Sequence, residues 1–428
     1  MKVLKGILLS GCLLLLLGAC FSLFFQKKVL RLGVYAVSSW DVPNSRENRV
    51  LDQAIERFEK AHPDIRVEYE SGIPKEDYED WLSEKILLGE QPDVFLVPES
   101  RFSSLARAGA FKPLDGFQGK EAEALYYPVA YQSGLYKGQS FALPLESNPI
   151  MMCVNQDLLE QEGLAIPETA WTLEDLYRLC QKLTKDTNGD GIIDQFGITD
   201  YSWQQALVAY GGQLKSQTGL NLDSPEMHQA LKFMSQLEAL NQNYRVSSTD
   251  FDQGKVAFFP MSLAQYRTYK PYPYHVAKYS TFAWTCVPMP GASGVDQGTQ
   301  IKTSLLAMSA KTAYAAEVWE FMTLLCADQE TQQELFTKSQ GTSSLKAVVT
   351  SPESQKVLQA NVFGSHAISP EKLDYMMEHS VLDLSQDLEQ ELLERIHYRV
   401  DGIIKSGEVD SQLPRLQREL ELTLRAEE

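Results

Sequence analysis

An alternation of strand-like and helix-like patterns near the start of the chain constrains the fold most. Residues 29–35, 65–69 and 94–97 have the composition of strands, and the last is a continuous apolar run typical of a buried parallel strand. Between them, residues 50–58 and 81–87 place their apolar side chains at helical spacing. Strand, helix, strand, helix, strand is the order expected of a doubly wound α/β lobe.

A second α/β lobe is expected because the same pattern returns later in a chain of 428 residues, a length that fits two domains. Thr172 and Asp175 have the spacing of a capping box at the start of a helix. Gly89 and Gly407 are expected to end helices, and the stretch from Ser365 to Gly407 has a helical pattern. Further strands are expected over residues 141–145, 150–154, 256–259 and 282–287.

The N-terminal segment predicts export from the cytoplasm. Lys2 and Lys5 precede an apolar run over residues 7–17, and Leu-Gly-Ala-Cys20 follows. This segment resembles the bacterial lipobox, whose cysteine is lipidated by fatty acid and becomes the mature N-terminus. Because apolar residues also follow Cys20, residues 7–25 could span a bilayer as an uncleaved signal anchor, which is the alternative. Either way the bulk of the chain is expected on the extracytoplasmic face of the cell membrane.

The charge and the cysteines narrow the class of partner. A net charge of −18 argues against nucleic acid and anionic lipid surfaces. No Cys-x-x-Cys motif or cysteine–histidine cluster occurs, which disfavours a zinc or redox site. Four scattered cysteines lie in apolar contexts, where buried free thiols are expected and disulfides are the alternative. They are Cys153, Cys180, Cys286 and Cys326.

Seven segments resemble sequence blocks of the extracellular solute-binding proteins of ABC importers, and they occur in the same order. The type that they resemble is the maltose-binding type, known as family 1. They are Ala54–Val67, Gln91–Phe95, Ala108–Asp115, Phe141–Leu145 with Val154–Leu159, the helix opening at Trp171, Phe251–Phe258 and Val287–Gly291. The resemblance implies an α/β fold of two doubly wound lobes joined by a hinge, in the type II periplasmic-binding-protein arrangement. It also implies that a sugar or oligosaccharide is held between the lobes and passed to ABC permease subunits in the membrane.

The resemblance also implies a division of the chain. Crossings between lobes are expected near residues 147–150, 291–301 and 341, and the protein is expected to be a monomer. The expected parts are a signal peptide over 1–20, a tether over 21–28, a first lobe over 29–148 plus 299–342, and a second lobe over 149–298 plus 343–428.

Six residues in loops expected at the cleft are candidate ligand contacts. Aromatic faces suit the C–H surfaces of sugars, and carboxylates accept hydroxyl protons. Core packing is the alternative for each aromatic residue. The candidates are Trp40 and Asp41 after the first strand, Glu99 after residues 94–97, Glu146 at the lobe crossing, and Tyr201 and Trp203 further along.

An acidic loop before Tyr201 has the spacing of an EF-hand calcium loop. Oxygen ligands at positions 1, 3, 5 and 9, a glycine at 6 and a backbone carbonyl at 7 can surround a hard cation. Position 12 is Gly197, where a bidentate glutamate is expected, so the site would need another acid. Structural calcium is expected here, and a metal-free Asx turn is the alternative. The ligands would be Asp186, Asn188, Asp190, the carbonyl of Ile192, and Asp194.

Catalysis is the least favoured function. Paired acids such as Asp93 and Glu99 could serve a secreted glycosidase, but acids are abundant in this chain. No Gly-x-Ser-x-Gly, P-loop or metal triad occurs, so the chain is predicted not to be an enzyme and to need no catalytic cofactor. Two non-catalytic alternatives stay open, namely a receptor for another polar solute and a co-receptor that presents its ligand to a sensor kinase.

Overall fold

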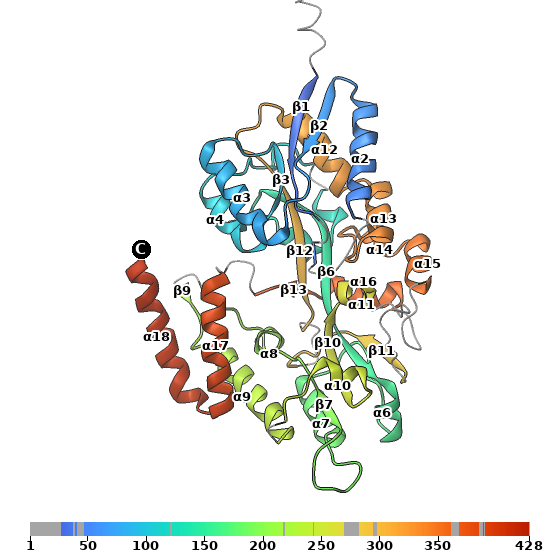
Figure 1. Ribbon diagram of the computed structural model, residues 1–428, viewed down its shortest axis with the longest axis vertical. Coiled ribbons are helices and arrows are strands. Elements are labelled where there is room, and N and C mark those ends of the chain that lie inside the picture. Colours follow the sequence, from blue (N-terminus) through green and yellow to red (C-terminus); the bar gives the residue numbers. More distant parts are fainter. Residues whose placement is uncertain are drawn as a thin grey trace, which may run out of the picture.

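The computed structural model describes residues 27–36, 39–40, 47–119, 122–216, 219–242, 244–268, 282–293, 298–360, 368–384, 388 and 390–427. The export segment with Cys20, and Asp41, lie outside the described residues. Figure 1 shows two lobes, one above the other, with strands that run from one into the other. Within the described ranges, no helix is long and apolar enough to cross a membrane.

The first lobe, the upper one in Figure 1, contains the predicted alternation. Strand β1 (Lys28–Gly33) pairs in parallel with β2 (Ile65–Tyr69) on one side and with β3 (Val94–Val97) on the other. Helix α3 (Lys75–Leu88) connects β2 to β3, and Gly89 ends it with a φ of 74°, as predicted. All four residues of β3 are buried, which agrees with its continuous apolar sequence.

Helices and short elements cover this sheet. After the chain has returned from the second lobe, α12 (Ala315–Cys326) and α13 (Gln329–Lys338) pack against α2 (Glu47–Ala61). The shared core includes Phe58 and Phe321, whose ring centroids are 5.0 Å apart. The short elements are the 3₁₀ turns η1 (Glu99–Arg101) and η2 (Glu123–Leu125), helices α4 (Phe102–Arg107) and α5 (Pro128–Gln132), and strands β4 (Leu135–Tyr136) and β5 (Gln139–Ser140).

Two long strands join the lobes. Strand β6 (Ala142–Asn155) pairs antiparallel with β12 (Gln300–Met308) along residues 142–149, and with strands of the second lobe from Ile150 onward. The sequence predicted two separate strands over residues 141–145 and 150–154, which is wrong. The intervening polar residues continue the strand because their backbone is paired with β12 and their side chains find buried partners.

The second lobe continues the sheet, whose order is β2-β1-β3-β12-β6-β10-β7, with β11 also paired to β6. Thr172 and Asp175 form the predicted capping box of α7. The predicted α/β class is confirmed. The elements are α6 (Gln156–Gln161), α7 (Leu173–Leu183), β7 (Phe196–Ile198), α8 (Trp203–Ala209), β8 (Lys215–Ser216), β9 (Gly219–Leu220), α9 (Pro225–Leu240), α10 (Ser248–Asp252), β10 (Val256–Ser262), α11 (Leu263–Thr268) and β11 (Trp284–Val287).

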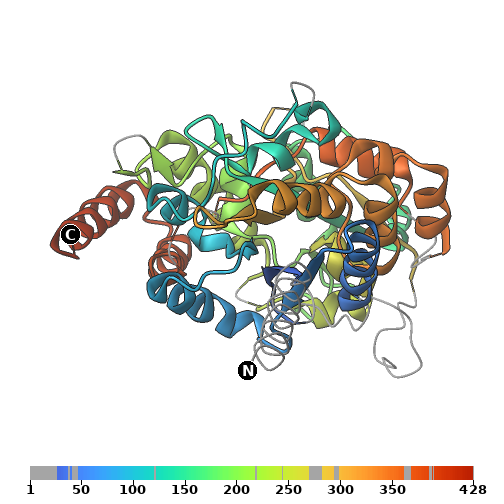
Figure 2. The same cartoon turned by 90° about the horizontal axis from the view of Figure 1, so that it is seen from above.

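The C-terminal part of the chain is mainly helical. Its first helices pack around α5 and β11 in a separate core, whereas α17 and α18 pack on α9 of the second lobe. Figure 2 shows the far end of α18 projecting from the body. Gly407 ends α17 with a φ of 68°, as predicted. The elements are α14 (Lys346–Val349), α15 (Pro352–Ala360), α16 (Pro370–Glu378), β13 (Val381–Leu382), α17 (Gln390–Ser406) and α18 (Val409–Glu427).

The four cysteines within the described ranges are buried free thiols. Cys153 and Cys286 face each other on β6 and β11, and their Sγ atoms are 3.0 Å apart. Cys180 and Cys326 lie in different cores, one in each lobe. Burial raises the pKa of these last two thiols, which keeps them protonated small apolar groups.

Candidate functional site

The centre of β6, where the chain passes between the lobes, is buried and polar. We call this segment, residues 146–148, the crossing. Glu146, Ser147 and Asn148 follow one another there, and at most 5% of each residue is exposed. The hydroxyl oxygens of Ser147 and Ser344 are 2.8 Å apart, and Asn148 Oδ1 accepts a hydrogen bond of 2.9 Å from the backbone N–H of Ala264. Because buried polar groups are costly unless bonded, these contacts fix the crossing strand in one position.

Three predicted features meet at this crossing, namely Trp40, Glu146 and the segment around Gly341. The backbone N–H of Gly341 donates a 2.8 Å hydrogen bond to Glu146 Oε1. A Cβ atom on Gly341 would lie 2.5 Å from that oxygen and 2.5 Å from Trp40 Nε1. The close approach therefore requires glycine at this position. The structure brings together residues that are more than 100 positions apart in sequence.

Arg267 is a functional candidate that the sequence did not reveal. It lies in α11 of the second lobe, is only 3% exposed, and donates through Nη1 to the carbonyls of Phe336 (2.7 Å) and Ser339 (3.1 Å). These carbonyls are at the C-terminal end of α13, where a cation is favourable. Burial lowers the pKa of Arg267 to about 10, and the negative charge of Glu146 opposes this shift. A buried positive charge thus lies beside the crossing, held by carbonyls of the other lobe.

The structure describes only the backbone of Glu99, and it does not describe Asp41. The backbone of Glu99 opens η1 directly after β3 and Pro98, so it lies at the carboxyl end of a parallel strand, as predicted. Its side chain lies outside the part that the structure describes, as does the whole of Asp41. Their roles in ligand contact stay predictions.

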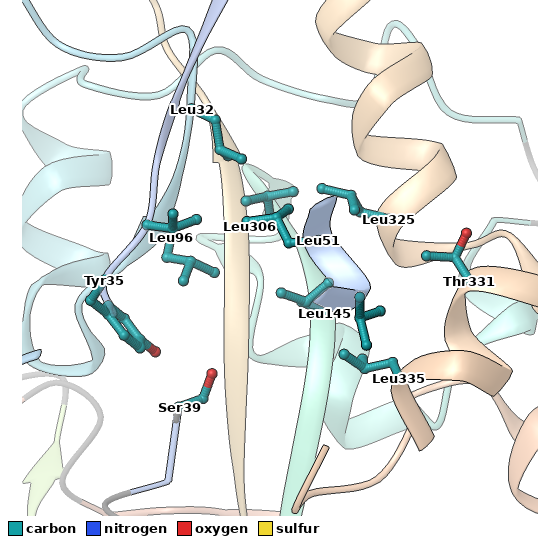
Figure 3. A pocket seen from close by; sticks show the side chains of 12 residues that line it. Leu32, Tyr35, Ser39, Leu51, Leu96, Leu145, Leu306, Leu325, Thr331 and Leu335 are labelled. Carbon is teal, nitrogen blue, oxygen red and sulfur yellow. The ribbon is translucent and has the colours of Figure 1, made fainter. Parts of the chain in front are cut away.

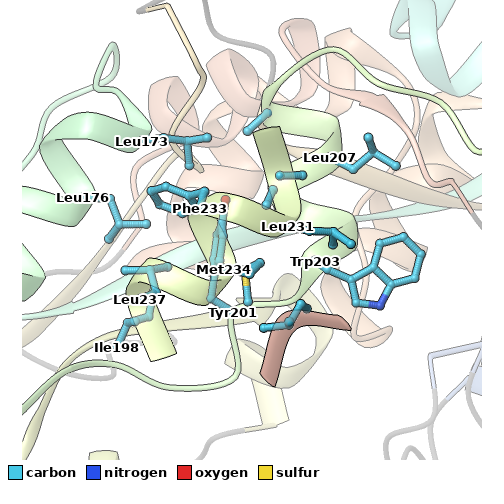
Figure 4. Close-up of a cluster of buried hydrophobic side chains, with 14 of the residues drawn as sticks. Leu173, Leu176, Ile198, Tyr201, Trp203, Leu207, Leu231, Phe233, Met234 and Leu237 are labelled. Carbon is cyan, nitrogen blue, oxygen red and sulfur yellow. The ribbon is translucent and has the colours of Figure 1, made fainter. Parts of the chain in front are cut away.

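Tyr201 and Trp203 are placed in the core of the second lobe, which is the alternative that their sequence context left open. Trp203 is 2% exposed, and its Nε1 donates a 3.1 Å hydrogen bond to His397 Nδ1 on α17. Figure 4 shows both aromatic side chains among the leucine and methionine side chains of this core. Burial also raises the pKa of Tyr201. Helix α17 contacts Trp203 through His397, and Tyr201 packs edge-on against Phe233 of α9.

A small apolar cavity adjoins the crossing on the side of the first lobe. Its volume is about 60 Å³, too small for a sugar ring. Figure 3 shows leucine side chains converging on it from β1, β3, β6, β12, α2, α12 and α13, with Tyr35 and Ser39 at one side. Leu145 lines the cavity directly before Glu146. The cavity is lined by side chains of the first-lobe core and is not itself suited to a carbohydrate.

The acidic loop over residues 186–194 is folded by hydrogen bonds within itself. Asp186 Oδ1 accepts from the backbone N–H of Gly189 at 2.7 Å, and its Oδ2 accepts from Gly191, also at 2.7 Å. These bonds, that from Gly191 first, lower the pKa of Asp186. Asp194 accepts from Thr187 through both of its oxygens. Within the described ranges, no group of three or more acidic, histidine or cysteine side chains is arranged to hold a metal.

The sequence matches a known family over most of the folded part of the chain. The family is described as "Bacterial extracellular solute-binding protein", and residues 43–332 match it. That range is about two thirds of the 428 residues. The chain belongs to this family. The resemblance seen in the sequence is therefore confirmed, and the solute-binding protein acts outside the cytoplasm.

Individual relatives are distant. The maltotriose-binding protein of Pyrococcus abyssi is 25% identical over 205 residues, which are 47% of this chain but only 42% of that relative. The solute-binding protein thus spans less than half the length of this relative in the match. A sugar transporter protein from Rhizobium etli, in an open conformation, is 17% identical with a TM-score of 0.71, over 90% of this chain and 97% of the other.

A third similarity extends over both lobes. A cyclic α-maltosyl-1,6-maltose binding protein from Arthrobacter globiformis has a TM-score of 0.69 at 15% identity, and the match covers 91% of this chain and 96% of the other. At these identities the structures establish the fold. The two-lobed arrangement is thus shared by proteins whose sequences have diverged almost completely.

Calcium in the acidic loop stays a prediction, and EDTA tests it. A metal that binds only the folded state stabilises it by about 2.7 kcal/mol at a hundredfold excess over its Kd. We expect EDTA to lower the melting temperature of the calcium-loaded protein, and Asp190→Ala to abolish that response. Asn241→Ala, at the end of a helix in the same lobe, should keep it. An unchanged melting temperature in EDTA would favour the metal-free Asx turn.

Proposed function

We propose that this solute-binding protein captures a sugar or oligosaccharide between its lobes and delivers it to the permease of an ABC importer. The main support for this proposal is the membership of the chain in the solute-binding family. The names of its relatives support a carbohydrate as the ligand. The maltotriose-binding and cyclic maltosyl-maltose-binding proteins are named for sugar ligands. The protein is proposed to act as a monomer and without catalysis.

The lobe crossing is proposed as the inner wall of the ligand site. Trp40 and Glu146 meet there with Gly341, and both were expected to contact a sugar. A ring face and a carboxylate are the groups that recognise the two sides of a sugar ring. Trp40 is only 6% exposed, and we propose that the lobes separate to admit the ligand and then close on it by a hinge.

A ligand screen tests this function. Purified protein is mixed with a panel of neutral and charged oligosaccharides, and the melting temperature and radius of gyration are measured. We expect at least one saccharide to raise the melting temperature and to reduce the radius of gyration, since hinge closure makes the protein more compact. Binding only of peptides or other polar solutes would refute the sugar proposal. Conversion of the bound sugar into products would refute the absence of catalysis.

Lipid anchoring through Cys20 is part of the proposal, and labelling tests it. Cells fed a fatty-acid probe should label the parent chain, and Cys20→Ala should lose the label and retain the uncleaved signal. Cys12→Ala serves as the matched control and should behave as the parent does. Equal mass and equal absence of label in parent and Cys20→Ala would favour the uncleaved signal anchor.

A further inference from the structure

A second cavity, which differs from the first in being lined by polar and charged residues, lies between the lobes and away from the crossing. Its volume is about 290 Å³, at the lower end of the range for small-molecule sites. The first lobe contributes residues of η1, α4 and β4, and the second lobe contributes Lys215 from β8. Figure 1 shows α4 on the same side of the molecule as β9 of the second lobe. The cavity thus has walls on both lobes.

The charge of this cavity is opposite to that of the protein. Among the residues that the structure describes, Arg101, Arg107 and Lys215 line it together with uncharged residues, and Arg101 forms an ion pair with Glu79 on α3. The chain as a whole carries 57 acidic and 39 basic residues, so three cations around one small cavity are contrary to the prevailing composition. A fourth cation, Lys137, has its Nζ 5.4 Å from the ring centroid of Tyr136, which also lines the cavity. A local positive field of this kind attracts an anion.

The arginine nearest to β3 is held in position. Glu79 on α3 accepts a hydrogen bond from Arg101 Nε and another, of 2.9 Å, from Ser100 Oγ. Ser104 Oγ in turn donates to the carbonyl of Arg101 at 3.0 Å. These bonds fix η1 and the start of α4, so that the guanidinium group and the serine hydroxyls keep one arrangement. A site built this way loses little side-chain entropy when a ligand binds.

We infer that this cavity binds an anionic sugar unit, one that carries a carboxylate or a sulfate group. Arginine matches the planar geometry of a carboxylate and the oxygens of a sulfate, and lysine adds a point charge. The ring of Tyr136 and the hydroxyls of the serines supply the apolar face and the polar bonds that a sugar ring needs. This inference rests on the proposed function. It narrows the proposed ligand class to acidic oligosaccharides long enough to extend from the crossing to α4.

Matched acidic and neutral sugars test the inference. The probes are trigalacturonate, its methyl ester, a sulfated chondroitin disaccharide and maltotriose, with affinity measured by calorimetry at low and at physiological salt. We expect trigalacturonate or the sulfated disaccharide to bind at least tenfold more tightly than the uncharged probes. The difference should decrease as salt rises, because charges near the surface are screened.

Two double variants test whether the cations of this cavity cause the preference for acidic sugars. Arg107→Ala with Lys215→Ala should reduce the affinity for acidic probes about tenfold more than it reduces the affinity for neutral sugars. Lys232→Ala with Arg399→Ala removes the same charge from the exposed surfaces of α9 and α17, and should keep the preference. Melting curves verify that both double variants fold.

Several outcomes would overturn the inference. Neutral sugars that bind as well as acidic ones would refute the anionic subsite but retain the proposed function. Failure of every saccharide to bind would refute both. Unchanged binding of acidic probes in Arg107→Ala with Lys215→Ala, together with loss of uptake in cells, would assign the cavity to contact with an acidic surface of the permease instead.

Discussion

Trp203→Ala is expected to lower the free energy of unfolding by about 3–5 kcal/mol, the range for truncating a large buried aromatic side chain. The ring is 2% exposed, and its centroid lies 5.2 Å from that of His397. The change removes this packing and the hydrogen bond to His397, so that α8 keeps its contact with that histidine of α17 only through Gln204. Urea denaturation of parent and variant measures the difference.

Trp203→Phe and Trp40→Ala are the controls for that result. The phenylalanine variant retains most of the buried ring and should lose less stability. Trp40→Ala should instead weaken sugar binding by up to about tenfold, because a stacking contact contributes about 0.5–1.5 kcal/mol beyond its buried area. A stable Trp203→Ala protein that has lost sugar binding would show that Trp203 contacts the ligand and is not a core residue.

Arg267→Met is expected to destabilise the protein by about 3–6 kcal/mol, because it removes two buried hydrogen bonds from a charged donor, each worth about 1.5–3 kcal/mol. The substitution retains apolar volume over the ring of Phe336, whose centroid is 4.5 Å from the guanidinium carbon. It removes two hydrogen bonds to the end of α13 and leaves the Glu146 carboxylate with less positive charge to offset its burial.

A double-mutant cycle separates these two causes. Glu146→Gln removes the negative charge alone, and combining it with Arg267→Met should cost less than the sum of the two single changes. Arg267→Lys should recover part of the stability because it restores the charge without the planar group. Additive losses would show that Arg267 acts only through its bonds to α13, and a loss under about 1 kcal/mol would contradict its role at the crossing.

Local signals in the sequence predicted the elements of the fold well. The capping box at Thr172, the helix end at Gly89 and the apolar strand over residues 94–97 depend on neighbouring residues alone, and each is present. The strand through Glu146 was missed in part because its polar residues look like a loop. Strand β12 and Thr342 provide the backbone partners of these residues, and both lie more than 150 residues later.

The site was less predictable because burial depends on distant segments. Trp203 is covered by His397, which is 194 positions away, so no local pattern distinguishes this ring from one at a cleft. Arg267 left no signal, since a single arginine in a short helix is usually exposed. Its apolar neighbours Leu263 and Tyr266 are both buried, and that context is the only sequence feature that could have indicated it.

The unbroken passage of β6 from one lobe into the other has a mechanical consequence. This strand is paired with β12 at one end and with β10 at the other, so any change in the angle between the lobes must bend and twist it. We expect the paired strands to bend most easily at the register shift between Ser304 and Leu305 of β12, because the hydrogen-bond ladder between β12 and β6 is interrupted there. We therefore expect substitutions at that irregularity to change the angle between the lobes without touching a bound solute.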